Sequence, residues 1–203
     1  MALDGWYVKE VTRKDITNFI ETWHYSKNIN GCICDYNFAL YSPDGIMKGA
    51  MFYGRMAMAN QWKRFSSSPD DVIELRRLCC VDDTPKNTES YFIGQTFKLL
   101  RKNWRRDGVI VSYADKEYGH EGTIYKATNF VMTREIAGAK VIMHGDKRYH
   151  DKAIRTKYKG ELKPFAKRLV EALKNGDAQY KNTAGKFTYV YNLCKKKHKL
   201  LST

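Results

Sequence analysis

The stretch GVIVSYADKEYGHEGTIYKATNF, residues 108–130, contains the features that decide the fold. After Gly108, the run Val109 to Ala114 is almost continuously apolar, which is typical of a central strand buried on both faces. The glycines that follow allow a tight connection, and 122–129 has the spacing of a short helix. A buried strand followed by a helix indicates a mixed architecture of helices and strands.

Strand and helix patterns continue outward from this stretch to both ends of the chain. Upstream, the sequence predicts strands over 6–11, 36–41, 47–53 and 72–80, and helices over about 12–23 and 88–104. Downstream, it predicts a strand pair over 130–136 and 139–144, a basic helix between Pro164 and Gly176, and a last strand over 187–193. We therefore expect an α/β (α+β) fold, a mixed central sheet flanked by helices, in one domain over 1–193 with a basic tail over 194–203.

The bulk composition fits a folded protein that is not built into a membrane. Hydrophobic residues make up 43% of the 203 residues, and no apolar run is long enough to span a bilayer. The first ten residues lack the basic-then-apolar pattern of a signal peptide. We therefore expect a cytoplasmic protein without membrane contact.

The five cysteines do not have the spacing of a metal site. Cys32 and Cys34 form a C-x-C pair and Cys79 and Cys80 are adjacent, and neither pattern is that of a zinc ribbon or finger. We expect structural cysteines and no metal site made from them.

The positive charge is concentrated near the C-terminus. The net charge is +14, and residues 147–203 hold 16 Lys or Arg against 4 Asp or Glu, which leaves only +2 for the rest of the chain. A basic surface in one segment suits a polyanionic partner such as nucleic acid. The alternative is a lysine-rich solvated face that serves solubility.

Polar residues that could carry chemistry stand in and after the apolar strand. Ser112 lies inside the apolar run and needs a buried hydrogen-bond partner, so it is either a site residue or a satisfied core hydroxyl. Asp115 follows the strand, where ligands bind in open α/β sheets, or else it caps a loop. Tyr125 is a candidate proton donor if its hydroxyl faces the site, and otherwise an ordinary packing aromatic.

The predicted strand over 72–80 carries three charged residues among apolar ones. Regular alternation places Glu74 and Arg76 on one face, where they can pair. Arg77 then lies on the other face with Ile73, Leu75 and Cys79. An unpaired guanidinium in that setting suits phosphate or carboxylate binding, although both arginines could instead make structural pairs.

Two helix ends provide further candidates. His24 lies between Trp23 and Tyr25 at the end of the first helix, where the three can stack on and hydrogen-bond a base, or where His24 can serve as a C-terminal cap. The loop before the second predicted helix places backbone N–H groups at a helix N-terminus, which can hold a phosphate. The candidate residues for cofactor binding there are Ser90, Phe92 and Gly94.

Residues 122–130 resemble the GNAT acyltransferase helix that ends in Tyr-x-x-x-Gly-Phe. Tyr125 matches the family's general-acid tyrosine, and Asn129 replaces the glycine. The resemblance implies acetyl-CoA or a related acyl-CoA as donor, with its pyrophosphate at the second helix. The family's glycine-rich pyrophosphate loop is degenerate here.

Four blocks together resemble the Mom family of phage DNA-modification proteins over roughly residues 20–135: WHYS at 23–26, ELRRL at 74–78, SYAD at 112–115 and GHEGTIYKA at 119–127. This resemblance implies conversion of adenine in double-stranded DNA to N6-carbamoylmethyladenine, which evades host restriction. It implies functional roles for the residues His24, Arg77, Ser112, Asp115 and Tyr125. An acyl transfer alone does not produce a carbamoylmethyl group, so a further nitrogen source or a metal-assisted step, iron included, stays open.

With DNA as substrate, the target base would be flipped out of the duplex and stacked on Trp23, Tyr25 or Tyr113. The phosphates would be held by the C-terminal basic segment, with the candidates Lys157, Lys159, Lys167, Arg168, Lys195, Lys196 and Lys197. A homodimer is open. The alternatives are an N-acetyltransferase acting on a small amine or protein, a GNAT-like enzyme for another DNA base, and a non-catalytic DNA-binding protein.

Overall fold

The computed structural model describes residues 3–58 and 60–194. The chain divides into two compact units, the first formed by Met1–Ala114, Glu121–Arg134 and Phe187–Thr203, and the second by Asp115–His120 and Glu135–Lys186. The expected domain over 1–193 thus contains a second compact unit. Of the expected tail over 194–203, only Cys194 lies within the described residues.

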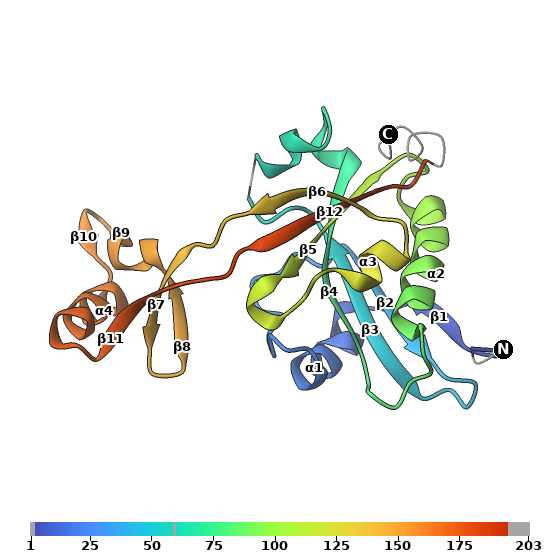
Figure 1. Cartoon of the computed structure of the whole chain (residues 1–203), viewed down its shortest axis with the longest axis horizontal. Coiled ribbons are helices and arrows are strands. Elements are labelled where there is room, and N and C mark those ends of the chain that lie inside the picture. The colour runs from blue at the N-terminus through green and yellow to red at the C-terminus, as the bar shows by residue number, and fades with distance from the viewer. Residues whose placement is uncertain (1–2, 59, 195–203) are drawn as a thin grey trace. The chain divides into compact units, whose positions relative to one another are not determined.

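A seven-stranded sheet organises the first unit, in the order β1-β2-β3-β4-β5-β12-β6 (Figure 1). Its strands are β1 (Tyr7–Glu10), β2 (Tyr36–Tyr41), β3 (Met47–Gly54), β4 (Val72–Cys80), β5 (Val109–Asp115), β6 (Val131–Ile136) and β12 (Lys186–Asn192). Neighbours from β1 to β4 are antiparallel, and parallel pairing begins between β4 and β5. This mixed sheet confirms the predicted fold class.

The helices of the first unit are α1 (Arg13–Trp23), α2 (Thr88–Asn103) and the short α3 (Thr123–Ala127). The predicted capping box of α1 is present, since the Thr12 amide and hydroxyl both donate to Asp15 Oδ2, at 2.8 and 2.7 Å. Short 3-10 turns lie at Gln61–Arg64 and Pro69–Asp71. Within the described residues, no helix is long and apolar enough to cross a membrane.

Helices cover both faces of this sheet. Phe38 and Leu40 on β2 pack in one apolar cluster with Phe97 of α2, whereas Ala39 between them packs with Ile16 of α1. Because successive residues of a strand point to opposite faces, α1 and α2 lie on opposite sides. This explains the long apolar runs in the central strands.

A β-bulge at Arg76 interrupts β4. Phe52 of β3 pairs with Arg77 and the next residue, Tyr53, pairs with Leu75, which leaves Arg76 without a partner on β3. The extra residue reverses the alternation of side chains. Ile73 and Leu75 pack under α2, as do Leu78 and Cys80, whereas Cys79 packs under α1. The expectation that Ile73, Leu75 and Cys79 share one face with Arg77 is therefore wrong.

The parallel ladder between β4 and β5 is short. It runs from Val72 opposite Val109 to Leu75 opposite Ser112, and β4 then continues to Cys80 and β5 to Asp115 without further pairing between them. We call the point beyond the Leu75–Ser112 pair the β4–β5 fork. The backbone groups of the two strands beyond this point do not bond to each other, so the fork is the natural place for a ligand in this sheet.

The second unit contains a three-stranded sheet in the order β11-β7-β8, with β7 (Lys140–His144), β8 (Lys147–His150) and β11 (Ala178–Asn182), and the short hairpin of β9 (Lys157–Tyr158) and β10 (Glu161–Leu162). It also contains the 3-10 turns Lys116–Tyr118 and Asp151–Arg155 and the helix α4 (Pro164–Asn175). Its core joins Ile142 of β7 and Ala178 of β11 to Leu169 and Ala172 of α4.

The predicted pairing of 130–136 with 139–144 is wrong. β6 joins the seven-stranded sheet, and β7 pairs with β8 and β11. Gly138 does not form a turn between them; a Cβ there would lie 1.6 Å from the carbonyl oxygen of Thr183, so the glycine allows two chain segments to touch.

Candidate active site

Ser112 is the polar residue at the β4–β5 fork. Its side chain is buried, and its Oγ donates a hydrogen bond of 3.2 Å to the carbonyl oxygen of Leu75 on β4. This supplies the buried partner that the sequence required. It also means that the single hydroxyl hydrogen of Ser112 is used, so that its oxygen remains available only as an acceptor.

The hydroxyl of Tyr125, on α3, lies near that of Ser112, close enough for Ser112 to affect its pKa. Burial raises the pKa of Tyr125 to about 12; the neighbouring Ser112 opposes this shift, and the nearby Tyr25, Glu74 and Tyr189 add to it. The phenol therefore keeps its proton at neutral pH and can serve as an acid.

Gly122 allows this placement of Tyr125. It has φ +73° at the start of α3, and a Cβ there would lie 2.3 Å from the ring of Tyr189. The Tyr189 hydroxyl donates to the carbonyl of Glu121 at 2.6 Å, and its ring packs against Tyr125 with centroids 5.2 Å apart. The absence of a side chain at Gly122 thus leaves room for the Tyr189 ring, which packs against Tyr125.

Asn129 takes over the conformation of the glycine that it replaces in the GNAT pattern. Its φ is +63°, the left-handed region in which Asn is the best tolerated residue after Gly. The chain can therefore leave α3 as a glycine would allow, with the Phe130 amide bonded to the carbonyl of Tyr125 at 2.9 Å.

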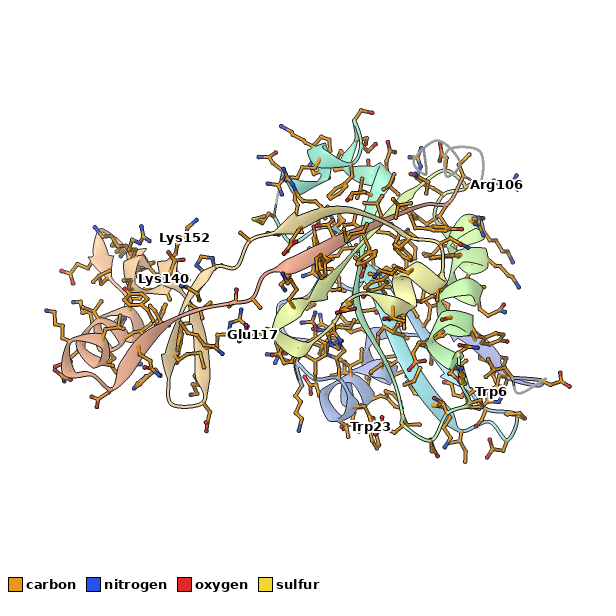
Figure 2. All side chains as sticks on the ribbon, viewed as in Figure 1. Trp6, Trp23, Arg106, Glu117, Lys140 and Lys152 are labelled. Atoms are coloured by element: carbon orange, nitrogen blue, oxygen red, sulfur yellow. The ribbon has the colours of Figure 1, made fainter. Side chains whose placement is uncertain are left out.

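His24 ends α1 and is buried. Its backbone N–H bonds to Ile20, so the interpretation as a C-terminal cap is confirmed. Its Nδ1 accepts the Ser26 amide at 3.1 Å, which places the ring proton on Nε2. Its ring contacts Tyr25 with centroids 4.1 Å apart. Tyr25 and Trp23, which is labelled at the end of α1 in Figure 2, are about half exposed.

Glu74 is a site residue that the sequence analysis treated only as the partner of Arg76. The predicted pair is present, with Arg76 Nη1 and Glu74 Oε2 3.6 Å apart and both side chains largely buried. The charge of Glu74 also raises the pKa of both Tyr125 and Tyr113. A carboxylate that acts on two tyrosines near the fork is a candidate proton acceptor.

Tyr113 lies on the opposite face of β5 from Ser112. Its ring packs beside Val111 and Trp62, and its hydroxyl accepts a hydrogen bond of 2.5 Å from Gln61. Burial raises its pKa to about 12, and Glu74 adds to the shift. The side chains of Ser112 and Tyr113 therefore have different neighbours on the two faces of the sheet. Base stacking by Tyr113 stays a prediction.

Arg77 donates through Nη1 to the carbonyl of the bulged residue Arg76, at 2.7 Å. Its Nε is buried without a hydrogen-bond partner in the part of the chain that the structure describes. Arg76 itself donates to the carbonyl of Arg55 at 3.0 Å. One guanidinium edge of Arg77 is thus occupied by backbone, and its role in cofactor binding stays a prediction.

The start of α2 fits a pyrophosphate poorly. The helix begins at Thr88, whose amide is bonded to Pro85, and Phe92 and Gly94 lie beyond the first turn, where amides bond within the helix. Ser90 alone of the predicted residues stands in the first turn. Phe92 is fully buried in the core. Glu89 stands in the first turn of this helix, where its carboxylate repels an anion.

Asp115 belongs to the second unit, where it has a structural role. It is buried, its Oδ1 accepts the Glu117 amide at 3.1 Å, and its Oδ2 lies 3.0 Å from Lys186 Nζ. The interpretation as a cap is confirmed, and its catalytic role stays a prediction.

Comparison with known proteins identifies the family. Residues 5–203 match the Mom protein family. The chain belongs to this family. It is 29% identical over 114 residues to the methylcarbamoylase Mom of Escherichia phage Mu, and the alignment covers 55% of this chain and 46% of the phage protein. The match thus spans about half the length of each.

The solved structures that this Mom-family chain resembles are acetyltransferases. Arabidopsis thaliana NAA60 in complex with acetyl-CoA has a TM-score of 0.53 and 10% identity, over 92% of this chain and 98% of that one. Spermidine/spermine N-acetyltransferase SpeG from Vibrio cholerae, in complex with manganese ions, has a TM-score of 0.53 and 8% identity, over 98% and 99% of the two chains. The chain therefore has the GNAT fold.

All four blocks that resemble the Mom family contribute residues at or near the fork. Glu74, Ser112 and Tyr125 come from β4, β5 and α3, and Tyr25, which contacts His24, comes from the end of α1. Two of the blocks are divided, because Ser112 and Tyr125 belong to the first unit, whereas Asp115 and His120 belong to the second.

The residues predicted to contact phosphates belong to the second unit, as far as they fall within the described residues. Lys157 and Lys159 belong to the β9–β10 hairpin, and Lys167 and Arg168 to α4. Lys167 pairs with Glu161 at 3.1 Å. Lys195, Lys196 and Lys197 lie outside the described residues.

Among residues 3–58 and 60–194, no three His, Cys, Asp or Glu side chains form a group that could hold a metal ion. Cys79 is buried under α1, and burial raises the pKa of its thiol to about 12. The structural role expected of this cysteine is thus confirmed, and the question of iron stays open.

Proposed function

We propose that this protein is a DNA-modifying transferase of the Mom type, which adds a group to the exocyclic amino group of adenine. The observation that carries the proposal is the placing of Tyr125 beside Ser112, whose hydroxyl is bonded to the Leu75 carbonyl at the β4–β5 fork. Membership of the Mom family supports DNA as the substrate. Protection of the DNA from restriction would follow from the modification.

Tyr125 would act as the general acid. The transfer breaks the bond between the donor group and its leaving atom, which departs with the electron pair and needs a proton. The pKa of Tyr125 is raised to about 12, so a phenol of this kind supplies its proton best to a strongly basic leaving group such as an alkoxide. Ser112 stands beside the Tyr125 hydroxyl, and its hydrogen would turn from the Leu75 carbonyl to the phenolate once that forms.

Glu74 would accept the proton that the amino group of adenine loses as its new bond forms. This amino group is a weak nucleophile, because its lone pair is delocalised into the ring, so a nearby carboxylate assists the attack. Glu74 lies close enough to Tyr125 for its charge to raise the pKa of that tyrosine. Glu74 faces the side of the sheet opposite to Ile73 and Leu75, so it would approach the fork from the face of Tyr113 and the acid from the face of Ser112.

The half-exposed rings of Trp23 and Tyr25 suit a flipped adenine. His24 is buried beside Tyr25, and its ring contacts the ring of Tyr25. These residues would hold the base, and Ser112 and Tyr125 would handle the transfer.

No step is assigned to CoA, because the first turn of α2 carries the carboxylate of Glu89, and its Thr88 and Tyr91 amides are bonded to backbone carbonyls. An acyl-CoA donor remains a prediction. The carbamoylmethyl group that the family resemblance implies joins N6 through its methylene carbon, whereas attack on a thioester forms an amide. The donor is thus a separate question from the base that is modified.

Nucleoside mass spectrometry tests the proposed function. Plasmid DNA from cells that express this protein is digested to nucleosides and compared with DNA from cells carrying the empty vector. We expect a mass-shifted deoxyadenosine. A shift on another nucleoside would favour the alternative of a different base, and four unmodified nucleosides would reject DNA modification.

A further inference from the structure

The second unit carries cations that its own carboxylates do not neutralise. Ion pairs occupy Lys116, Arg155, Lys167, Lys181 and Lys186. Within the described part of this unit, no ion pair is present for Lys140, Lys147, Arg148, Lys152, Lys157, Lys159, Lys163, Arg168 and Lys174. This unit therefore presents a surplus of positive charge to a polyanion.

The β9–β10 hairpin presents part of this charge on a rigid turn. Tyr158 pairs with Glu161 and Lys157 with Leu162, and the two linking residues, Lys159 and Gly160, have φ of +49° and +86°. Two central residues with positive φ make a type I′ turn, which matches the twist of a hairpin. The pairing is extended by a further bond of 2.9 Å, from the Lys163 amide to the Thr156 carbonyl.

Tyr158 is the most exposed large hydrophobic side chain that the structure describes, with 66% of its surface accessible. Lys159 lies over its ring, with Nζ 5.6 Å from the centroid. Glu161, the cross-strand neighbour of Tyr158, forms an ion pair with Lys167. The Tyr158 ring, between Lys157 and Lys159 in the sequence, is exposed and does not pack in the core of this unit. An exposed aromatic ring beside lysines suits contact with nucleic acid.

We propose that the β9–β10 hairpin enters a groove of double-stranded DNA and holds the second unit on its substrate. Lys157 and Lys159 contact phosphates, and Tyr158 lies against the groove. The major groove of B-DNA admits a two-stranded ribbon, whereas that of A-form RNA is too narrow and deep for side chains to read. The choice of DNA rests on the proposed function; the hairpin surface does not depend on the catalytic residues.

The salt dependence of DNA binding tests the lysines. The full-length protein is titrated against a fluorescent DNA duplex over a range of salt concentrations. In the double variant Lys157→Gln, Lys159→Gln we expect the slope of log affinity against log salt to become shallower by about two, since each phosphate contact contributes about 0.9. The matched control Lys14→Gln, Lys102→Gln changes two exposed lysines of the first unit and should keep the slope.

Tyr158 and the choice of nucleic acid are tested in the same assay. Tyr158→Ala should weaken binding about tenfold at one salt concentration with the slope unchanged, and Tyr158→Phe should retain most of the affinity. An RNA duplex of the same sequence should bind more weakly than the DNA.

An unchanged slope in the double lysine variant, or equal affinity for the RNA duplex, would overturn the proposal. Its failure is distinguishable from that of the proposed function. If adenine is modified and the hairpin variants bind DNA as the wild type does, the hairpin proposal is rejected and the proposed function stands. If DNA binding depends on the hairpin but no base is modified, the proposed function is rejected and the hairpin proposal stands.

Discussion

Ser112 and Leu75 are the last pair of the parallel ladder between β4 and β5, and Ser112 Oγ donates to the Leu75 carbonyl at 3.2 Å. The bond closes the ladder where the strands part and orders the Ser112 hydroxyl, which lies near Tyr125. One side chain thus has a structural and a chemical role.

The first prediction concerns this bond. Ser112→Ala leaves the buried Leu75 carbonyl without its donor and should lower the free energy of unfolding by about 1–3 kcal/mol, measured by urea denaturation. Thr188→Val is the matched control, because the buried Thr188 hydroxyl has no hydrogen-bond partner among the described residues. Its removal should be neutral or stabilising, and equal losses in both variants would contradict this role of Ser112.

The second prediction concerns the titration of Tyr125. Its pKa is raised from the ordinary 10 to about 12, so folding favours the protonated phenol. The resulting stability is complete below pH 10 and is lost as the pH rises towards 12. The difference between the phenolate absorbance of the wild type and of Tyr125→Phe should therefore develop well above pH 10. A difference that develops at or below pH 10 would show that this hydroxyl is not buried.

The third prediction concerns Glu74. Glu74→Gln keeps the size of the side chain and removes the proton acceptor, so we expect the rate of DNA modification to fall by about 10²–10⁴-fold. Glu171→Gln, an exposed change on α4, should retain the wild-type rate. Circular dichroism of both variants checks the fold. A Glu74→Gln variant with full activity would exclude this carboxylate as the base.

The fourth prediction concerns the left-handed residue after α3. Asn129→Gly should leave stability unchanged or raise it slightly, because Gly adopts φ +63° freely. Asn129→Val should cost about 1–2 kcal/mol, because a β-branched side chain is strained there. Both values follow from thermal or urea unfolding. Equal stability of the two variants would argue against the positive φ.

Much of the first unit could be predicted from local sequence, because its signals are local. The apolar run of β5, the capping box of α1 and the turn between β2 and β3 each depend on neighbouring residues. The need of Ser112 for a buried partner was also visible, since a hydroxyl in an apolar strand must be satisfied. The identity of the partner, Leu75, was not, because it lies on another strand.

Other features depend on contacts that the local pattern does not contain. The bulge at Arg76 exists only in relation to Phe52 and Tyr53 of β3, so regular alternation gave the wrong neighbours for Arg77. The strands of the second unit are short and mostly exposed, and β11 has only Ala178 buried. Such strands have no apolar alternation to reveal them, which explains why a second unit was not expected.

The most direct test of the account is whether DNA modification requires the Tyr125 hydroxyl. Tyr125→Phe and the control Tyr7→Phe, on the edge strand β1, are expressed to equal soluble levels beside the wild type, and the nucleosides of plasmid DNA are measured by mass spectrometry. The account predicts mass-shifted deoxyadenosine with the wild type and Tyr7→Phe, and a loss of about 10²-fold or more with Tyr125→Phe. Equal modification by Tyr125→Phe would contradict it.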